Sequence, residues 1–309
     1  MRILALIPGG IDAQINFFPT LETLQSTYAH AKIDVLVEPR AKKAYRVCKY
    51  VHDVLLFDYQ DRNSMADYLN LLGVIRDREY EAALSFGTPW TVSSLLWLNG
   101  IPIRIGDRSR NPWLFSKTIP LNKDQYAAEM YHSSLTGLDI KANCPQVKIN
   151  VPQEDIDWVE ARQKGLGINS GYILLHSKDE IYPARNWKSI IADIQKKQPE
   201  MPIVLLQDQD NGEWVTQMLE SHPQLKVSAP SDVGKSAAII AGANLFLSTD
   251  TVSISLAVAV GTYTIALFSS TGDSKKLLPP VSEKYVNIPS PTGKISDIAP
   301  NTVLEKLWS

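Results

Sequence analysis

The sequence predicts an α/β protein of two lobes, each built on a parallel sheet, with the two sheets facing each other across a cleft. Short apolar runs alternate with longer amphipathic stretches from end to end, as expected for parallel strands joined by crossover helices. The same rhythm starts again about halfway along the chain. With 309 residues, 44% of them hydrophobic, the chain can fill two domains of roughly 150 residues each.

The first half holds enough alternating segments for one complete Rossmann-like lobe. The opening run MRILALIPGG is interrupted by two glycines and Asp12, too early for a signal peptide or a membrane span, so we expect a buried first strand. The expected strands are Arg2–Ile7, Ile33–Val37, Asp53–Phe57, Ala82–Ser85, Ile103–Ile105 and Lys117–Pro120. The expected helices lie around Ile15–Tyr28, Ala41–Val47, Met65–Asp77, Thr91–Leu98 and Gln125–Leu135.

The second half repeats the pattern and predicts a second, similar lobe. A short closing helix at Asn301–Ser309 has one apolar side, which packs either on this lobe or back on the first. The expected strands are Tyr172–Leu175, Ile203–Leu206, Leu225–Val227, Leu245–Ser248 and Thr264–Phe268. The expected helices lie around Trp187–Lys197, Trp214–Ser221, Val233–Ala241 and Ser253–Val260.

A proline-containing segment, Asn143–Glu154, separates the two halves. It holds Pro145 and Pro152 and shows no helical periodicity, so it reads as a stiff, extended link. We therefore predict an N-terminal lobe of residues 1–152 and a C-terminal lobe of residues 153–309.

Composition narrows the function classes. The 31 Lys and Arg residues nearly balance the 33 Asp and Glu residues, so no general attraction to nucleic acid or to an anionic membrane is expected. Cys48 and Cys144 lie far apart and outside any CxxC motif, which indicates neither a disulfide framework nor a zinc site. We expect a protein of a reducing compartment.

Ligands of open parallel sheets bind beyond the carboxyl ends of the strands, and the loop after the first expected strand is one candidate. Gly9 and Gly10 permit a tight turn there, and Asp12 follows near a helix start. Asp12 is either an N-cap or a functional carboxylate. Glu38 ends the second strand, where a dinucleotide-binding enzyme has its ribose-binding acid, but the G-x-G-x-x-G spacing is missing.

Two further loops stand out in the second half. The segment after the strand ending at Leu175 carries Lys178 and Arg185 near a helix start, cations that suit a diphosphate, although a solvated loop is the simpler interpretation. The segment 248–253 follows an apolar strand, and its hydroxyls and amides can hold phosphate oxygens. In the simpler interpretation, Asp250 or Thr251 is an N-cap there.

Basic residues of the first half are candidates for holding an anionic acceptor, although surface solubility explains scattered cations equally well. Arg108 and Arg110, in a turn-rich loop beside Asn111, are the better placed among them. The wider set consists of Arg40, Lys42, Lys43, Arg46, Lys49, Arg104 and Lys117.

Taken in order, several motifs resemble glycosyltransferase family 9, the bacterial heptosyltransferases. The run GIPIRIG at 100–106 is similar to the family's G-I-P-x-R-I-G. ARNWK at 184–188 resembles its basic-x-Trp motif, and AGANLFLSTDT at 241–251 resembles its A-G-A-D-L-x-I-S-x-D-T. The opening segment 1–24 matches the family's strand, turn and helix at Gly10, Asp12, Pro19 and Leu21.

The resemblance implies a GT-B fold and an inverting sugar transfer without metal ion or cofactor. It implies Asp12 as the base, although an alignment anchored on Pro19 puts the family's base position on Ala13. The acceptor, an anionic glycan or glycolipid of the lipopolysaccharide kind, would contact Gly10, Arg108 and Arg110. The donor, an ADP-sugar carrying heptose or a related sugar, would contact Lys178, Arg185, Asp250, Thr251, Val252, Ser253, Gln207 and Glu213.

Some positions depart from the family pattern. Ile11 separates the turn glycine from Asp12, and Val252 and Ser255 stand where the family has Gly and His. A catalytically degenerate protein that binds a nucleotide sugar or a glycan is therefore the alternative, and a nucleotide-sugar epimerase comes third. The expected location is the cytoplasm, with peripheral contact at the inner face of the plasma membrane and no nucleic-acid partner.

Overall fold

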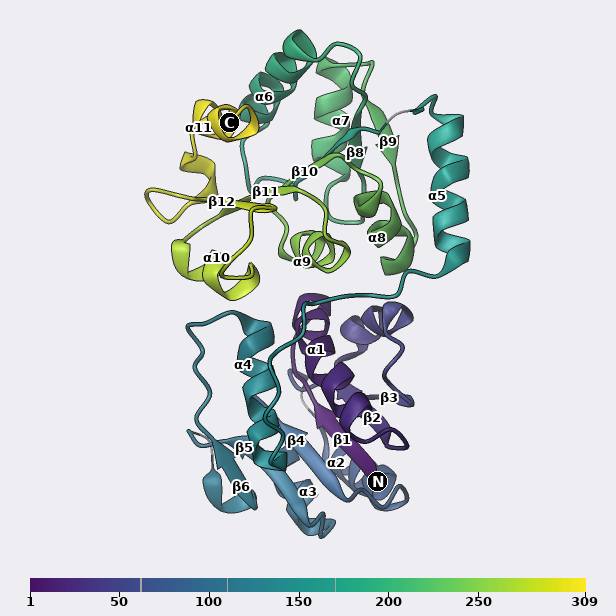
Figure 1. The fold of residues 1–309 in the computed structure, drawn as a ribbon, viewed down its shortest axis with the longest axis vertical. Coiled ribbons are helices and arrows are strands. Elements are labelled where there is room, and N and C mark those ends of the chain that lie inside the picture. Colours follow the sequence, from purple (N-terminus) through teal and green to yellow (C-terminus); the bar gives the residue numbers. More distant parts are fainter. Residues whose placement is uncertain (62, 110, 170) are drawn as a thin grey trace. The chain divides into compact units, whose positions relative to one another are not determined.

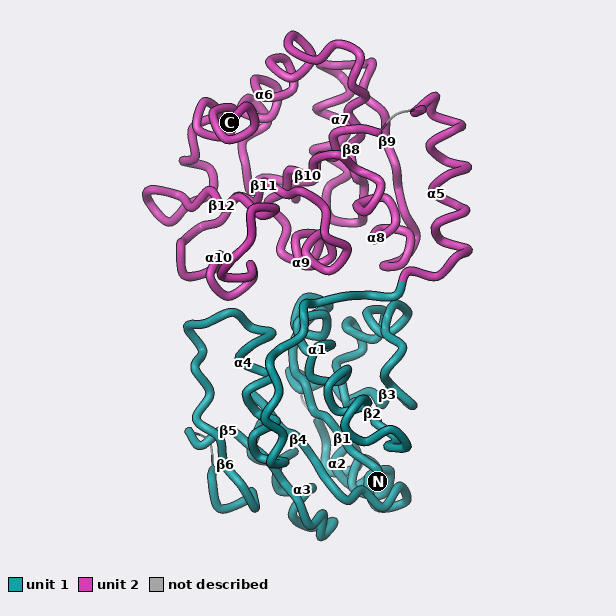
Figure 2. The backbone as a smooth tube through the Cα atoms, in the orientation of Figure 1, with its two compact units in different colours: residues 1–150 teal, residues 151–309 magenta. Residues whose placement is uncertain are grey.

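The computed structural model describes residues 1–61, 63–109, 111–169 and 171–309. The chain divides into two compact units, Met1–Asn150 and Val151–Ser309 (Figure 2). Each unit is a parallel six-stranded sheet with helices packed on it, so the predicted α/β class with two sheets is confirmed (Figure 1). No described helix has the length and apolar character needed to cross a membrane.

In unit 1 the strand order is β3-β2-β1-β4-β5-β6, and every adjacent pair is parallel. The central strand β1 is apolar on both faces, as a strand covered by helices on each side must be. The strands are β1 Arg2–Leu6, β2 Lys32–Val37, β3 Asp53–Leu56, β4 Ala82–Ser85, β5 Ile103–Asp107 and β6 Lys117–Ile119. The helices are α1 Ile11–Thr27, η1 Pro39–Val47, α2 Met65–Arg76, α3 Trp90–Leu98, η2 Pro112–Leu114, α4 Ala127–Ser133 and η3 Ser134–Leu138.

In unit 2 the strand order is β12-β11-β10-β7-β8-β9, again parallel throughout. The strands are β7 Ile173–His176, β8 Ile203–Leu206, β9 Lys226–Ser228, β10 Leu245–Ser248, β11 Thr264–Phe268 and β12 Tyr285–Pro289. The helices are α5 Gln153–Gly165, α6 Ala184–Lys197, α7 Gly212–Ser221, α8 Val233–Ala241, α9 Thr251–Val260, α10 Thr271–Leu277, η4 Ile295–Asp297 and α11 Pro300–Leu307.

Aromatic side chains anchor the core of unit 2 between α6 and α7. Trp187 is fully buried, and its ring centroid lies 5.5 Å from those of both Tyr182 and Trp214 in edge-to-face geometry. Such pairs add about 0.5–1.5 kcal/mol beyond the burial of their area. Trp187 is therefore a core anchor of this unit.

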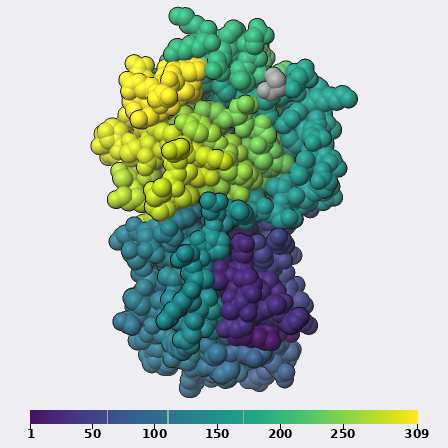
Figure 3. All heavy atoms as spheres, in the orientation of Figure 1, coloured from purple at the N-terminus to yellow at the C-terminus, as the bar shows by residue number. Residues whose placement is uncertain are grey.

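The C-terminal helix α11 packs on α6 within unit 2. The indole nitrogen of Trp308 donates to an Asp193 carboxylate oxygen at 2.7 Å, and the Lys197 ammonium lies 4.7 Å from the Trp308 ring centroid. The yellow C-terminal segment accordingly lies beside the α6 region on the surface of this unit (Figure 3). Of the two expected positions for this helix, packing on its own lobe is the one adopted.

Some local predictions were wrong. The expected helix at Ala41–Val47 is the 3₁₀ segment η1, which begins at Pro39. The long expected helix around residues 125–135 is split into a short α4 and the 3₁₀ segment η3. Three elements of unit 2, α5, α10 and β12, lie in segments for which no helix or strand was predicted.

Candidate functional site

The strand order of unit 2 reverses between β7 and β10, and this topological switch point is where open α/β sheets bind ligands. His176 and Ser248 pair in register at the carboxyl ends of these two strands. The loops that follow are therefore neighbours, and the hydroxyl oxygens of Ser177 and Thr249 lie 3.1 Å apart. Two of the three loops selected from sequence thus meet at one point.

A buried histidine occupies the centre of this point. The Nε2 atom of His176 lies 3.0 Å from a carboxylate oxygen of Asp208, which follows β8. Its Nδ1 atom is buried, has no hydrogen-bond partner among the described residues, and lies 4.0 Å from a carboxylate oxygen of Asp250. Burial raises the pKa of Asp208, but the hydrogen bond and charge of His176 outweigh this effect and hold the pKa below its ordinary value. The imidazole therefore lies between two carboxylates.

Lys178, the expected diphosphate ligand, is ion-paired within the unit. Its Nζ atom lies 3.1 Å from Asp250 Oδ1 and 4.0 Å from Asp210 Oδ2. Burial lowers the pKa of Lys178, but the carboxylates of Asp250, Asp210 and Asp208 outweigh that and raise it above its ordinary value. The ammonium is therefore held charged, and more than one negative charge already surrounds it.

Asp250 is the N-cap of α9, which was one of the simpler interpretations of its loop. Its carboxylate accepts a hydrogen bond from the Ser253 amide at 2.8 Å, and the Asp250 amide donates to the Ser248 hydroxyl at 3.0 Å. Thr251 and Val252 follow in the first turn, where helical amides lack an intrahelical acceptor. Ser253 is buried and its amide is taken by Asp250, whereas Thr251 is exposed.

The remaining expected donor residues lie on neighbouring loops of unit 2. Arg185 is exposed in the first turn of α6, and Gln207 is half-buried directly after β8. Glu213 lines a cavity of about 190 Å³ between the first turns of α6 and α7, together with Asp179 and Glu180. Carboxylates dominate the polar lining of this cavity, so its charge opposes a phosphate and favours a hydroxyl or cationic group.

In unit 1 the strand order reverses between β1 and β4. The turn after β1 needs its first glycine, because Gly9 has φ +121° and a Cβ there would lie 2.9 Å from the Ala13 Cβ. The Gly9 amide donates to Glu38 at 2.9 Å, and the Arg40 guanidinium pairs with the same carboxylate at 2.6 Å. One Glu38 oxygen thus holds the turn and the other pairs with Arg40, which counts against the use of Glu38 as a ribose ligand.

Asp12 lies in the first turn of α1, which begins at Ile11. The N-cap of α1 is Gly10, so the interpretation of Asp12 as a cap was wrong. Its side chain is half-buried, and its charge adds to burial in raising the pKa of Tyr131 to about 12. The carboxylate therefore faces α4 across the turn, close to the carboxyl end of β1.

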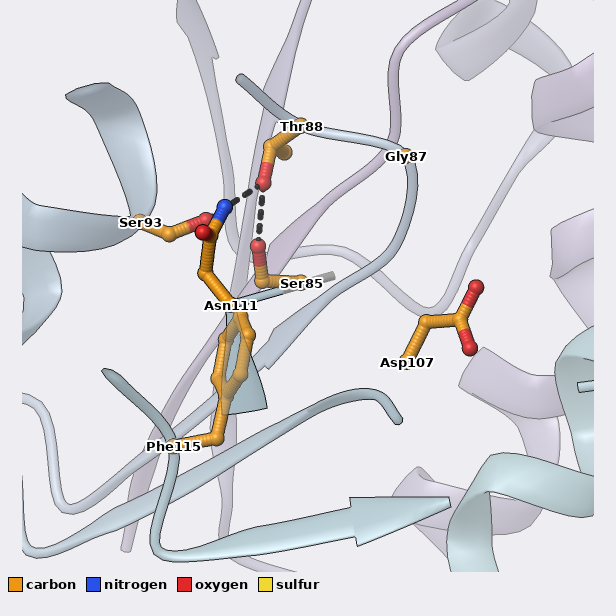
Figure 4. Close-up of a pocket in the computed structure, with 7 residues that line it drawn as sticks. All are labelled: Ser85, Gly87, Thr88, Ser93, Asp107, Asn111 and Phe115. Carbon is orange, nitrogen blue, oxygen red and sulfur yellow. Dashed lines mark hydrogen bonds between the residues drawn. The ribbon is translucent and has the colours of Figure 1, made fainter. Parts of the chain in front are cut away.

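A small polar cavity at the ends of β4 and β5 was missed by sequence reasoning. The hydroxyls of Ser85 and Thr88 lie 2.6 Å apart, and those of Thr88 and Ser93 lie 2.9 Å apart (Figure 4). The cavity measures about 10 Å³, room for about one water, and Asp107 and Asn111 complete its polar lining. The rule that ligands lie after strand ends points to Ser85 and Thr88, because both follow the apolar run of β4.

Of the two arginines expected to hold the acceptor, the structure describes only Arg108. Arg108 is exposed directly after β5, and Arg110 lies outside the described residues. The neighbouring Asp107 is buried and pairs with Lys123 at 2.9 Å. Burial raises the pKa of Asp107, but hydrogen bonds from Ser109 and Lys123 outweigh it and hold the pKa below its ordinary value.

Residues 69–307 match Glycosyltransferase family 9 (heptosyltransferase). The chain belongs to this family. Its fold is similar to that of the family 9 glycosyl transferase from Veillonella parvula DSM 2008, with a TM-score of 0.85 at 15% identity, covering 99% of this chain and 96% of the other. It is also similar to E. coli ADP-heptose lps heptosyltransferase II, with a TM-score of 0.77 at 18% identity, covering 99% and 97%.

The chain is similar to two further proteins. The E. coli heptosyltransferase WaaC with ADP-2-deoxy-2-fluoro heptose has a TM-score of 0.76 at 16% identity, covering 100% of this chain and 99% of the other. A curated relative is the chloroplastic Photosynthetic NDH subunit of subcomplex B 1 of Arabidopsis thaliana. It is 23% identical, over 98% of this chain and 72% of its own length. Family 9 membership and the GT-B-like fold therefore agree with the resemblance drawn from the motifs.

Within this family 9 chain, the two positions that depart from the motif lie on α9. Val252 is half-buried in the first turn, and Ser255 is buried with its hydroxyl lacking a hydrogen-bond partner among the described residues. The helix between them and Val260 is apolar and fully packed. α9 is a continuous helix at these positions. Val252 places methyl groups where the family pattern has Gly, and Ser255 places a hydroxyl where it has His.

Proposed function

We propose that the chain is an inverting, metal-independent glycosyltransferase that moves a sugar from a nucleotide-diphosphate donor to a glycan or glycolipid acceptor. Family 9 membership supports this, as do structural neighbours that were solved with ADP or an ADP-sugar. The observation that carries the proposal is the cluster at the β7 and β10 ends. There a charged lysine and the first turn of α9 meet at the switch point of the sheet.

Unit 2 would hold the donor. Lys178, Arg185 and the amides of Thr251 and Val252 would stabilise the negative charge that grows on the departing diphosphate. Asp250 would accept a hydrogen bond from the donor sugar while it orients Lys178. Gln207 and Glu213 would contact the ribose or the base, which agrees with the hydroxyl-accepting character of the acidic cavity.

Unit 1 would hold the acceptor, with Asp12 as the general base. In this role the carboxylate takes the proton from an acceptor hydroxyl while that oxygen attacks the anomeric carbon from the face opposite the nucleotide. The bond to the diphosphate breaks as the new glycosidic bond forms, and the configuration inverts. General-base assistance of this kind contributes about 10²–10⁴-fold to the rate.

A non-catalytic binding role is the second candidate. It is favoured by the carboxylates that surround Lys178, by the acidic lining of the cavity near Glu213, and by Val252 and Ser255 on α9. It is also favoured by the relative that is named as a subunit of a photosynthetic complex. In this role the same fold would present a surface or hold a sugar nucleotide without transferring the sugar.

Thermal denaturation with ADP-, UDP- and GDP-sugars tests donor binding. We expect one nucleotide class to raise the melting temperature of the wild-type chain and to raise it less in Lys178→Ala. The matched control is Lys306→Ala, an exposed lysine on α11 whose removal should leave the shift unchanged. If no nucleotide sugar shifts the melting temperature, the proposal that unit 2 binds a donor is wrong.

Release of nucleoside diphosphate from the bound donor then separates the two candidates. Turnover that Asp12→Asn abolishes supports the transferase, whereas donor binding without release in the presence of glycolipid extracts supports the binding role. Equal release by wild type and Asp12→Asn would remove Asp12 from the mechanism.

A further inference from the structure

Unit 1 exposes several large aromatic side chains on α3 and η2. Trp90, Trp97 and Trp113 are 60%, 51% and 67% exposed. Trp90, Trp97 and Leu98 lie at helical spacings of seven and eight residues, on one face of α3. The tryptophan surface, as we name it, comprises Trp90, Trp97, Leu98, Trp113, Met65 and Leu69.

The elements that carry these side chains are in contact with one another. α3 packs against both α2 and η2. The Thr91 hydroxyl donates to the Tyr68 hydroxyl at 3.3 Å, which ties α3 to α2, and Arg104 Nε donates to the Leu114 carbonyl at 2.9 Å, which ties η2 to β5. The elements that carry the exposed side chains are therefore fixed to one another.

The combined exposed area of these side chains can be compared with that of a protein interface. A fully buried aromatic ring covers 150–250 Å², so at these exposures the three tryptophans alone leave roughly 270–450 Å² in water. The largest apolar patch on a monomer is about 300–600 Å² and is commonly functional. Met65, Leu69 and Leu98, all more than half exposed, bring the total toward the ~800 Å² that each partner contributes to a standard interface.

The charges of this region select the kind of partner. α3 contains no charged residue. An anionic bilayer would need several free cations around the rings, but Arg104 is directed at backbone carbonyls and Lys117 pairs with Asp139 at 2.9 Å, which leaves exposed Arg108 among the described residues. The uncharged face of α3 meets a copy of itself without repulsion between like charges, as a two-fold symmetric interface requires.

We propose that the tryptophan surface is a homodimer interface, in which two copies of this chain pack α3 against α3 about a two-fold axis. Tryptophan and methionine, which are enriched at interface cores, would fill its centre. The rest of the chain needs no rearrangement, because the side chains already point into solvent. The proposal is independent of the transferase chemistry.

Sedimentation velocity of the full chain over a range of concentrations tests this proposal. We expect a concentration-dependent species of twice the chain's mass, and we expect Trp90→Gln/Trp113→Gln to raise the dissociation constant by at least about tenfold. The matched control is Val281→Gln, which changes a side chain of unit 2 that is 91% exposed and should leave association unchanged. Because both tryptophans are exposed, the double variant should melt within a few degrees of wild type.

Three results would overturn the proposal. The first is a wild-type chain that stays monomeric at every concentration. The second is a dimer that the double tryptophan variant does not weaken. The third is flotation with phosphatidylcholine vesicles that the same variant abolishes, which would assign the surface to a lipid interface.

Discussion

Replacing Asp250 by alanine removes two interactions that the structure places on one carboxylate. One oxygen accepts the Ser253 amide at 2.8 Å as the N-cap of α9, and the other lies 3.1 Å from the Lys178 ammonium. The side chain is only 5% exposed, so water cannot take over either role without a rearrangement of the loop. Asp250→Ala is therefore expected to destabilise unit 2.

The expected loss in unfolding free energy is the sum of the contributions of the N-cap and the ion pair. Loss of an N-cap acceptor costs about 1 kcal/mol, within a range of about 0.5–2 kcal/mol. The ion pair contributes less than a buried pair would, because the Lys178 side chain is 38% exposed and its charge is screened by water, so about 1 kcal/mol or less is assigned to it. The expected loss in the free energy of unfolding is therefore roughly 2 kcal/mol.

Asp250→Asn separates the two parts. Asparagine caps helices about as well as aspartate, so this variant keeps the cap and loses only the charge, with an expected cost of roughly 1 kcal/mol or less. Hydrogen exchange of the α9 amides is the appropriate assay, because it reports on this helix alone in a chain of two units. Equal losses of protection in the alanine and asparagine variants would refute the assignment of the larger part to capping.

Three other predictions concern separate parts of the chain. Burial raises the pKa of Asp34, but hydrogen bonds from Tyr80, Arg2 and His52 and the charge of Arg2 hold that pKa below the ordinary 3.8. The ionised carboxylate therefore stabilises the fold fully above that pH, and this stabilisation is lost as the pH falls through the lowered pKa of the folded state. Asp34→Asn should flatten the acid limb of the melting temperature against pH. Gly171→Ala should cost more than about 1 kcal/mol, because Gly171 has φ +90° and a Cβ would lie 1.8 Å from Asn244 Oδ1; an unchanged melting temperature contradicts this. Asp12→Ala should keep the melting temperature and lose transfer by at least about 10²-fold, measured as nucleotide release.

The strands of both units were predictable because most of them are short and apolar on both faces, with polar loops after them. β12 was missed since it is an edge strand, half-exposed and ending at Pro289, so it lacks the apolar run that marks the others. α5 was missed because it is charged on most of its surface, and it buries only Asp155 and Val159 in the described structure. Its helical state depends on packing against α8, which no local pattern records.

The candidate site was predictable in position and not in its pairings. Strand ends fixed where the loops after β7 and β10 would lie, because carboxyl ends of parallel strands share one edge. The pairing of His176 with Asp208 and of Lys178 with Asp250 joins residues 32 and 72 positions apart. Such pairs depend on strand register and side-chain rotamer. A single sequence therefore shows cations near a helix start but does not show that one of them is already ion-paired.

Because Lys178 is ion-paired with Asp250, the Asp250→Asn variant also measures what the site binds. A diphosphate must compete with Asp250 for the Lys178 ammonium, so removing the carboxylate charge should tighten ADP binding. If Asp250 also holds the sugar of the donor, the same variant should lose more of its affinity for the ADP-sugar than for ADP. Titration calorimetry with both ligands measures the two effects. Tighter ADP binding without any penalty for the sugar would indicate that Asp250 serves the fold and the lysine alone, which is the pattern expected of a family 9 chain that no longer transfers sugar.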